Sequence, residues 1–286
     1  MTREGTFLVT GSTGKVGRNV VTGLLEEGAR VSALVRDPHA ARLPAGVSIN
    51  QGDLERADTV ATAAEGADAA FLLWPGFSTT GAADVVTALA RHVSRVVYLS
   101  AARLQHDTDG AMDGVWSDIE ALIEDSGVGW TLVRAGGFAA NTLEWAEQIR
   151  AGDTVRIPYP NAARSLVHER DIADVAVHAL LEPELAGRTF AVTGPEVLTQ
   201  LEQVRAIGAA IGRELQVEEQ SADVTRREYE SLMGAEFADR AIAYWASLVD
   251  VPERATGDVE RVTGQPARTF AQWACDHAAD FTSRPS

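Results

Sequence analysis

The chain has 286 residues, 45% of them hydrophobic, and a formal net charge of −16 at pH 7. So acidic an average surface repels nucleic acid, and no apolar run approaches the length of a bilayer span, so neither nucleic acid nor a membrane is an expected partner. Cys275 is the single cysteine, which excludes an internal disulfide and favours a reducing, cytoplasmic location.

Strand and helix patterns alternate from the start of the chain, and we expect no basic and apolar leader before them. Short apolar runs typical of buried strands occupy residues 6–10, 29–36, 47–53, 68–74, 95–101 and 129–136. Amphipathic patterns predict helices between them, at residues 15–28, 56–66, 82–93 and 114–127. Apolar strands that alternate with helices predict an α/β fold, in which a doubly wound parallel sheet is covered on both faces.

The pattern changes after residue 137. Helical patterns cover residues 141–152, 169–183, 199–212, 222–248 and 268–281, and extended patterns cover residues 154–160 and 187–194. We expect these segments to add strands at the sheet edge and to form a small C-terminal α/β lobe that binds substrate. Because no Gly/Ser-rich linker separates the parts, we predict that a core of residues 1–137 and the remaining residues 138–286 pack as one compact unit. Cys275 lies in the last helical pattern, where we expect a packed or idle thiol.

The first turn, TGSTGKVG, carries Gly11, Gly14 and Gly17 between a predicted strand and a predicted helix. In a βαβ unit this is the Rossmann fingerprint. Gly11 allows the tight turn, Gly14 lets the backbone approach a pyrophosphate, and Gly17 lets the helix pack close to the strand. The free N–H groups and positive dipole of the helix start then face the phosphates. The spacing excludes a mononucleotide P-loop, so we predict a dinucleotide cofactor.

The second predicted strand ends in ALVRDP, where the first polar residue is Arg36. An NAD-selective site usually places a carboxylate here to hold the ribose diol, whereas a guanidinium suits a 2′-phosphate by its charge and its forked donors. The sequence therefore favours NADP(H). Asp37 follows at once, so NAD(H) stays open as the alternative.

A series of segments in this order resembles the atypical short-chain dehydrogenase/reductases, and within them the NmrA-like group of NAD(P)H-binding proteins and quinone reductases. The segments are TGSTGKVGRNVV, LVRDP, QGDLERADTVATAAEGADAAFLLWP, VVYLSA, SGVGWTLVRAGGFAAN, VHERDIADVAVHAL and FAVTGPEVLTQLE. The glycine turn is shared by many folds, and the TLVRAGGF and RDIADVA segments are the more specific part of the match. The resemblance implies a Rossmann fold and an NAD(P)H-dependent activity.

The resemblance also implies cofactor contacts, residue by residue. They are Thr13, Lys15 and Val16 in the pyrophosphate turn, Arg36 at the adenosine phosphate, Asp53 and Leu54 at the adenine, Leu73, Trp74 and Pro75 beside the ribose, Ser100 and Ala101 next to the nicotinamide, and Ala135, Gly136, Gly137 and Phe138 lining its pocket. These positions follow strand ends of the predicted sheet, where open α/β sheets bind ligands.

The larger short-chain family carries Tyr-x-x-x-Lys on the helix after the fifth strand, where the tyrosine delivers a proton and the lysine lowers its pKa. In this chain the natural alignment places Trp116 at the tyrosine position and Glu120 at the lysine position. An indole is no useful proton donor near neutral pH, and a carboxylate cannot replace the lysine's charge. We expect Glu120 either to hold a ribose hydroxyl or a polar substrate group, or to be an exposed helix carboxylate. Ser100 is a candidate to hydrogen-bond a substrate oxygen, with a backbone-bonded serine as the alternative.

Aromatic residues from segments expected near the cleft predict a pocket for a flat, apolar or aromatic small molecule, if these residues converge. They are Trp74, Phe77, Trp116, Phe138, Trp145 and Tyr159. The alternative for each is a place in the hydrophobic core. His168 precedes a helix start, where we expect a capping or surface role, and His106 lies in a polar stretch that we expect to form a loop over the site. No residue set has the spacing of metal ligands.

Three functions fit these observations. The first is an NADPH-dependent oxidoreductase that transfers hydride to a quinone-like or conjugated aromatic or apolar molecule, whose anionic product takes a proton from water. The second is an NmrA-like redox sensor that binds NADP(H) without turnover and signals to a protein partner. The third is an isomerase or dehydratase on the same fold. The missing Tyr/Lys pair favours the second and third, and the aromatic residues favour the first and third. We expect a monomer or a homodimer.

Overall fold

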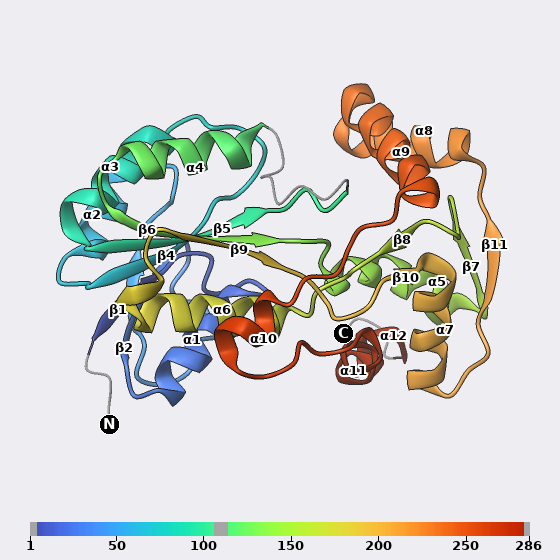
Figure 1. The fold of residues 1–286 in the computed structure, drawn as a ribbon, viewed down its shortest axis with the longest axis horizontal. Helices are drawn as coiled ribbons and strands as arrows, with labels where there is room; N and C mark the ends of the chain where they lie inside the picture. Colours follow the sequence, from blue (N-terminus) through green and yellow to red (C-terminus); the bar gives the residue numbers. More distant parts are fainter. Residues whose placement is uncertain (1–4, 106–113, 283–286) are drawn as a thin grey trace.

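The computed structural model describes residues 5–105 and 114–282 (Figure 1). His106, which we placed in a loop over the site, lies outside the described residues. Among the helices of the described ranges, none combines the length and the apolar character that a membrane span requires.

One parallel sheet forms the centre of the core. Its strands are β1 (Thr6–Val9), β2 (Arg30–Val35), β3 (Ser48–Gln51), β4 (Ala69–Leu73), β5 (Arg95–Ala101), β6 (Gly129–Ala135) and β9 (Arg188–Val192). Their spatial order is β3-β2-β1-β4-β5-β6-β9, and every neighbouring pair is parallel. The strand order reverses between β1 and β4, which is the point where doubly wound sheets bind their ligands. The predicted α/β fold with a doubly wound sheet is confirmed.

Helices cover both faces of this sheet (Figure 1). The helices α1 (Gly17–Glu26), α6 (Glu169–Leu181) and α10 (Asp258–Thr263) pack on one face, and α2 (Ala57–Ala64), α3 (Ala82–His92) and α4 (Val115–Asp125) pack on the other. The strands alternate between these two apolar clusters, because successive side chains point to opposite faces. In β5, for example, Val97 and Leu99 join the α1/α6 side, whereas Val96 and Tyr98 join the α4 side.

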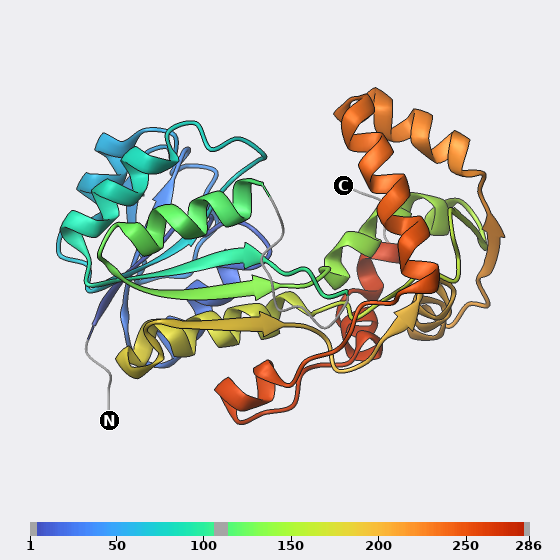
Figure 2. The same cartoon turned by 45° about the horizontal axis from the view of Figure 1, so that its top comes forward.

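A second lobe lies beyond the carboxyl ends of the strands, toward which the arrows of β5, β6 and β9 point (Figure 2). It consists of η1 (Ala139–Trp145), α5 (Ala146–Ala151), β7 (Thr154–Ile157), β8 (Ala163–Arg164), β10 (Leu198–Thr199), α7 (Gln200–Ile211), β11 (Gln216–Glu219), α8 (Ala222–Met233), α9 (Ala235–Asp250), α11 (Phe270–Asp276) and α12 (Ala278–Thr282). The short helix η2 (Pro183–Leu185) joins α6 to β9. The lobe has its own apolar cluster, which includes Trp145, Ile149, Val204 and Trp273.

The helix boundaries of the lobe differ from the predicted ones. Residues 222–248 form two helices, because Gly234 between them has a φ of +88°, which a continuing helix cannot accommodate. The predicted helix at 268–281 is likewise divided into α11 and α12, and residues 139–145 form a 3₁₀ helix ahead of α5.

Candidate active site

The glycine turn between β1 and α1 has the geometry that a dinucleotide requires. Gly11 adopts a φ of +61°, which favours glycine. A Cβ on Gly17 would lie 2.1 Å from the carbonyl oxygen of Gly11, so only glycine lets α1 approach the turn this closely. A Cβ on Gly14 would lie 3.2 Å from the same oxygen and meet nothing else within 4 Å, so the open side of the turn is formed by Gly14.

Unused polar groups surround this turn. The N-terminus of α1 has no side-chain cap. The N–H groups of Arg18 and Asn19 donate to the carbonyls of Gly14 and Val16, so within the described residues the Gly17 N–H is the one at the helix start that is left for an anionic ligand. The hydroxyls of Ser12 in the turn and Ser100 at the end of β5 are buried and have no hydrogen-bond partner in the described part of the chain. Buried hydroxyls normally find a partner, so both positions fit a cofactor that runs along this edge of the sheet. Ser100 is therefore not the backbone-bonded serine that we considered.

Arg36 and Asp37, at the end of β2, are the two candidates to bind the adenosine ribose or its 2′-phosphate, and their surroundings differ. Arg36 is exposed, and its guanidinium makes no hydrogen bond within residues 5–105 and 114–282. The Asp37 carboxylate, in contrast, accepts hydrogen bonds from the backbone N–H groups of His39 at 2.9 Å and Ala40 at 3.4 Å. Asp37 therefore stabilises its own turn, whereas Arg36 is free to bind a phosphate.

The residues implied at the adenine and ribose lie at the ends of β3 and β4. Asp53 is half-buried and its carboxylate accepts from the N–H of Glu55, while Leu54 is buried in the core. Leu73 would lie 3.3 Å from a Cβ on Gly11, so it forms part of the floor of the glycine turn. Trp74 donates from its indole to the Ser78 carbonyl, and Pro75 is exposed beside it. Thr13 and Lys15 are exposed in the turn, and Val16 is buried beneath it. Their cofactor contacts stay predictions.

Helix α4 shows what replaces the proton-delivering pair. Trp116 packs against the α4-side core and meets the ring of Phe77 edge-on at 5.8 Å. Glu120 is buried, and its two carboxylate oxygens accept from Nε and Nη2 of Arg134, at 3.0 and 2.7 Å. The expectation of an exposed carboxylate is wrong, because Arg134 on β6 compensates this buried charge. An acid or base role for Glu120 is correspondingly disfavoured.

The loop after β6 joins the core to the lobe. Ala135, Gly136 and Gly137 lead into Phe138, which pairs with Val167. A Cβ on Gly136 would lie 2.7 Å from Leu104, and one on Gly137 would lie 2.4 Å from Nη2 of Arg164. A side chain at Gly136 would require Leu104 to shift, and one at Gly137 would require Arg164 and Leu166 to shift. Ala101, at the end of β5, is half-buried on the same edge.

The predicted aromatic pocket is divided. Trp74, Phe77 and Trp116 lie on the core side, with Phe77 64% exposed and also 6.2 Å from Phe237 of α9. Phe138 packs at the edge of the α1/α6 cluster. Trp145 is buried in the lobe, and Tyr159 lies in a loop with a φ of +49° and lines neither cavity described below. The six residues therefore do not converge on one pocket.

Two cavities border the lobe, and the inner one also reaches the core through Lys15. The inner cavity, of about 370 Å³, has Lys15, Glu144, Trp145, Arg164, Gln203 and Trp245 in its wall. The lobe cavity, of about 830 Å³, has Trp145, Arg156, Gln220, Tyr229, Leu232 and Trp245 in its wall. The Nζ of Lys15 donates to the Ala140 carbonyl at 3.1 Å, which connects the glycine turn to η1. The sequence reasoning did not find Tyr229 or Trp245, because nothing local in the α8–α9 region marks which side chains face a cavity.

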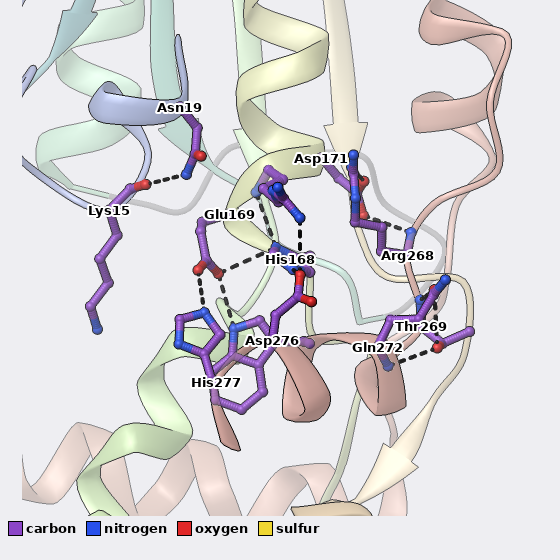
Figure 3. A network of polar contacts seen from close by, with 12 residues as sticks. Lys15, Asn19, His168, Glu169, Asp171, Arg268, Thr269, Gln272, Asp276 and His277 are labelled. Atoms are coloured by element: carbon purple, nitrogen blue, oxygen red, sulfur yellow. Dashed lines mark hydrogen bonds and ion pairs between the residues drawn. The ribbon is translucent and has the colours of Figure 1, made fainter. Parts of the chain in front are cut away.

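His168 and the residues around it hold the lobe to the core (Figure 3). Nδ1 of His168 caps α6 by accepting from the Arg170 N–H, as predicted, but the side chain is buried and not on the surface. Glu169 accepts from the indole N–H of Trp273 at 3.0 Å. It also contacts Nε2 of His277 at 2.7 Å (Figure 3). The hydrogen bond with Glu169 raises the pKa of His277, whereas burial lowers the pKa of His168. Burial alone would raise the pKa of Glu169, but the histidine contacts lower it.

The thiol of Cys275 is exposed on α11. Within the described ranges, no group of three histidine, cysteine, aspartate or glutamate side chains is placed to hold a metal ion.

Comparison with known proteins assigns the family. Residues 11–183 match a family model described as NAD(P)H-binding. The chain is 35% identical to the (4-alkanoyl-5-oxo-2,5-dihydrofuran-3-yl)methyl phosphate reductase of Streptomyces griseus, covering 96% of this chain and 99% of that protein. It is 33% identical to the NAD(P)H azoreductase of Xenophilus azovorans, with the same coverage of both chains.

Solved structures share the fold. An NADPH-dependent quinone oxidoreductase from Escherichia coli superposes with a TM-score of 0.77 at 19% identity, covering 94% of this chain and 98% of that one. A triphenylmethane reductase from Citrobacter sp. gives a TM-score of 0.80 at 17% identity, covering 96% and 99%. The matching family model and the two curated reductases show that the chain belongs to the NAD(P)H-binding family, as an NAD(P)H-dependent oxidoreductase.

Proposed function

We propose that the protein reduces a double bond conjugated to an electron-withdrawing group in an apolar or aromatic small molecule, with NADPH as the preferred donor. The observation that carries this proposal is the replacement of the proton-delivering pair on α4. Trp116 cannot donate a proton, and the Glu120 carboxylate is bound by Arg134. A simple ketone needs acid assistance for reduction, whereas a conjugated acceptor is already electrophilic and spreads the negative charge of its product.

The curated relatives support this substrate class. The compound named for the Streptomyces griseus reductase has a ring double bond conjugated to a ring carbonyl and an alkanoyl group, and it carries a phosphate. The Xenophilus azovorans enzyme is named for an azo group, which is also an electron-accepting double bond. Both acceptors can take a hydride without a dedicated acid.

The preference for NADPH follows from the end of β2. The Arg36 guanidinium is exposed and makes no hydrogen bond within the described part of the chain, while the Asp37 carboxylate is used by its own turn. When bound, the reduced nicotinamide supplies the hydride. The chain itself orients the reactants. The glycine turn and Ser100 hold the cofactor side, and Trp145 and Trp245 wall the substrate side and exclude water.

The test is a panel of acceptors with NADPH consumption and product mass as readouts. We expect turnover with an alkanoyl butenolide, a quinone or an azo dye, and none with a saturated aliphatic ketone of similar size. NADPH deuterated at the transferred position should place one deuterium on the β-carbon of the butenolide. Turnover of the saturated ketone at a comparable rate would refute the proposed substrate class. Tight binding of NADPH without turnover of any acceptor would favour the sensor function instead.

A further inference from the structure

Arg164 on β8 is an unusually buried charge beside the proposed site. Its side chain is 13% exposed, and its Nη2 would lie 2.4 Å from a Cβ on Gly137, in the loop that the resemblance places at the nicotinamide. Burying a guanidinium is costly unless it is paired. The groups around Arg164 therefore show what it is oriented for.

A carboxylate and two aromatic rings hold the guanidinium of Arg164 in place. Oε1 of Glu253 accepts from Nε at 3.0 Å and from Nη2 at 2.9 Å, and it also accepts from the Tyr244 hydroxyl. The rings of Tyr244 and Trp245 lie 5.3 and 5.5 Å from the central carbon, within the range of cation–π contact. Although burial alone would lower the pKa of Arg164, the charge of Glu253 raises it, so the guanidinium stays charged at every physiological pH.

One nitrogen of the Arg164 guanidinium, Nη1, is not used by these contacts. Nη1 of Arg164 has no acceptor among the described residues, and Arg164 forms part of the cavity wall together with Lys15. Trp145, Trp245 and Leu143 supply apolar surface in the same wall. A rigidly held donor beside the indole rings of the same cavity wall suits a molecule with one anionic group and an apolar body.

We propose that Arg164 binds an oxyanion, a phosphate or a carboxylate, carried by the substrate, with Nη1 as the donor. This assignment rests on the proposed function for the identity of the substrate as the ligand. It narrows the substrate class from apolar acceptors to amphipathic ones. The inner cavity, of about 370 Å³, limits the part of the molecule next to the anionic group to a small ring or a short chain.

Glu144 provides a control within the same cavity, because its charge is opposite to that of Arg164 and its removal should change anion binding in the opposite direction. It lies in the wall of the inner cavity with Arg164, and although burial raises the pKa of its carboxyl, the charge of Arg164 acts in the opposite direction. A negative charge there repels an anionic ligand, so Glu144→Gln should strengthen anion binding. A merely structural role of Arg164 gives no reason for that increase.

The test measures binding directly, with n-octyl phosphate, octanoate and octanol as probes, by calorimetry on protein saturated with NADP⁺. We expect both anions to bind at least about tenfold more tightly than octanol, the lower end of what a charge-assisted hydrogen bond contributes. The ratio of the two anions tells phosphate from carboxylate. The double variant Arg164→Gln, Glu253→Gln avoids an uncompensated buried carboxylate and should lose this preference. Arg226→Gln, which removes a lobe arginine that pairs with Asp239 and Glu230 outside both cavities, should keep it.

Three results would overturn the assignment. One is equal binding of the anions and octanol to the unaltered protein. Another is weakening of anions and octanol by the same factor in the double variant. The third is a parallel loss of NADP⁺ affinity in that variant, which would make the bound oxyanion the cofactor's own. None of these measurements needs turnover, so failure of the proposed reduction and failure of the anion site are distinguishable.

Discussion

Replacement of Arg36 by alanine tests how the protein selects its cofactor. The guanidinium makes no hydrogen bond within the described residues and is exposed, so its removal should leave the fold and the free energy of unfolding unchanged. Hydrogen bonds to charged groups contribute about 1.5–3 kcal/mol, which corresponds to a loss of about 10- to 100-fold in affinity for NADPH. Because the site is exposed, salt screens it, and we expect the lower part of that range near physiological ionic strength.

The assay is a fluorescence titration of NADPH and NADH into the unaltered protein and Arg36→Ala, at low and at high salt. NADPH affinity should fall, and NADH affinity should not change, because NADH lacks the 2′-phosphate. The ratio between the two proteins should shrink as salt increases. Asp37→Asn is the matched control, since its carboxylate is bound by the turn and should not discriminate the cofactors. Equal weakening of NADPH and NADH in Arg36→Ala would refute the idea that this residue reads the phosphate.

Further substitutions address the turn, the helix and the lobe anchor. Gly14→Val should fold and lose NADPH binding in a titration, whereas Gly17→Ala, whose Cβ would lie 2.1 Å from a backbone oxygen, should also lower the melting temperature. Glu120→Gln should lower the melting temperature but change kcat less than tenfold. An acid–base group would contribute about 10²–10⁴-fold, so a loss of that size with intact NADPH binding would make Glu120 catalytic. Trp116→Phe should change KM more than kcat, because we expect Trp116 only to line the substrate pocket. A larger change in kcat than in KM would contradict this. The folded protein holds the His277 proton above the ordinary pKa of 6.5, so its charge stabilises fully below that pH and this contribution is lost as pH rises through the raised pKa. Denaturation of His277→Gln should therefore show the larger deficit at pH 6 than at pH 9, and a deficit independent of pH would refute it.

The sequence by itself determined the core. Apolar runs and helical periodicity are local properties, and they predicted β1 to β6 and α1 to α4 in the right order. The glycine turn was predictable for the same reason, since the φ of Gly11 and the close approach at Gly17 depend on residues a few positions apart. The place of Arg36 directly after β2 also followed from the strand pattern alone.

Only the tertiary structure decided which side chains share a site. Arg134 and Glu120 look unrelated along the chain, and their pairing turns an apparent catalytic candidate into a compensated buried charge. Arg164 meets Glu253 from 89 positions away, and Trp245 of α9 reaches the cavity that Trp145 of η1 also lines. Such partners are set by the packing of elements that are far apart in the sequence, because a buried charge is costly unless it is paired. Sequence periodicity determines which face of a helix or strand is apolar, whereas tertiary packing determines which residues that face contacts.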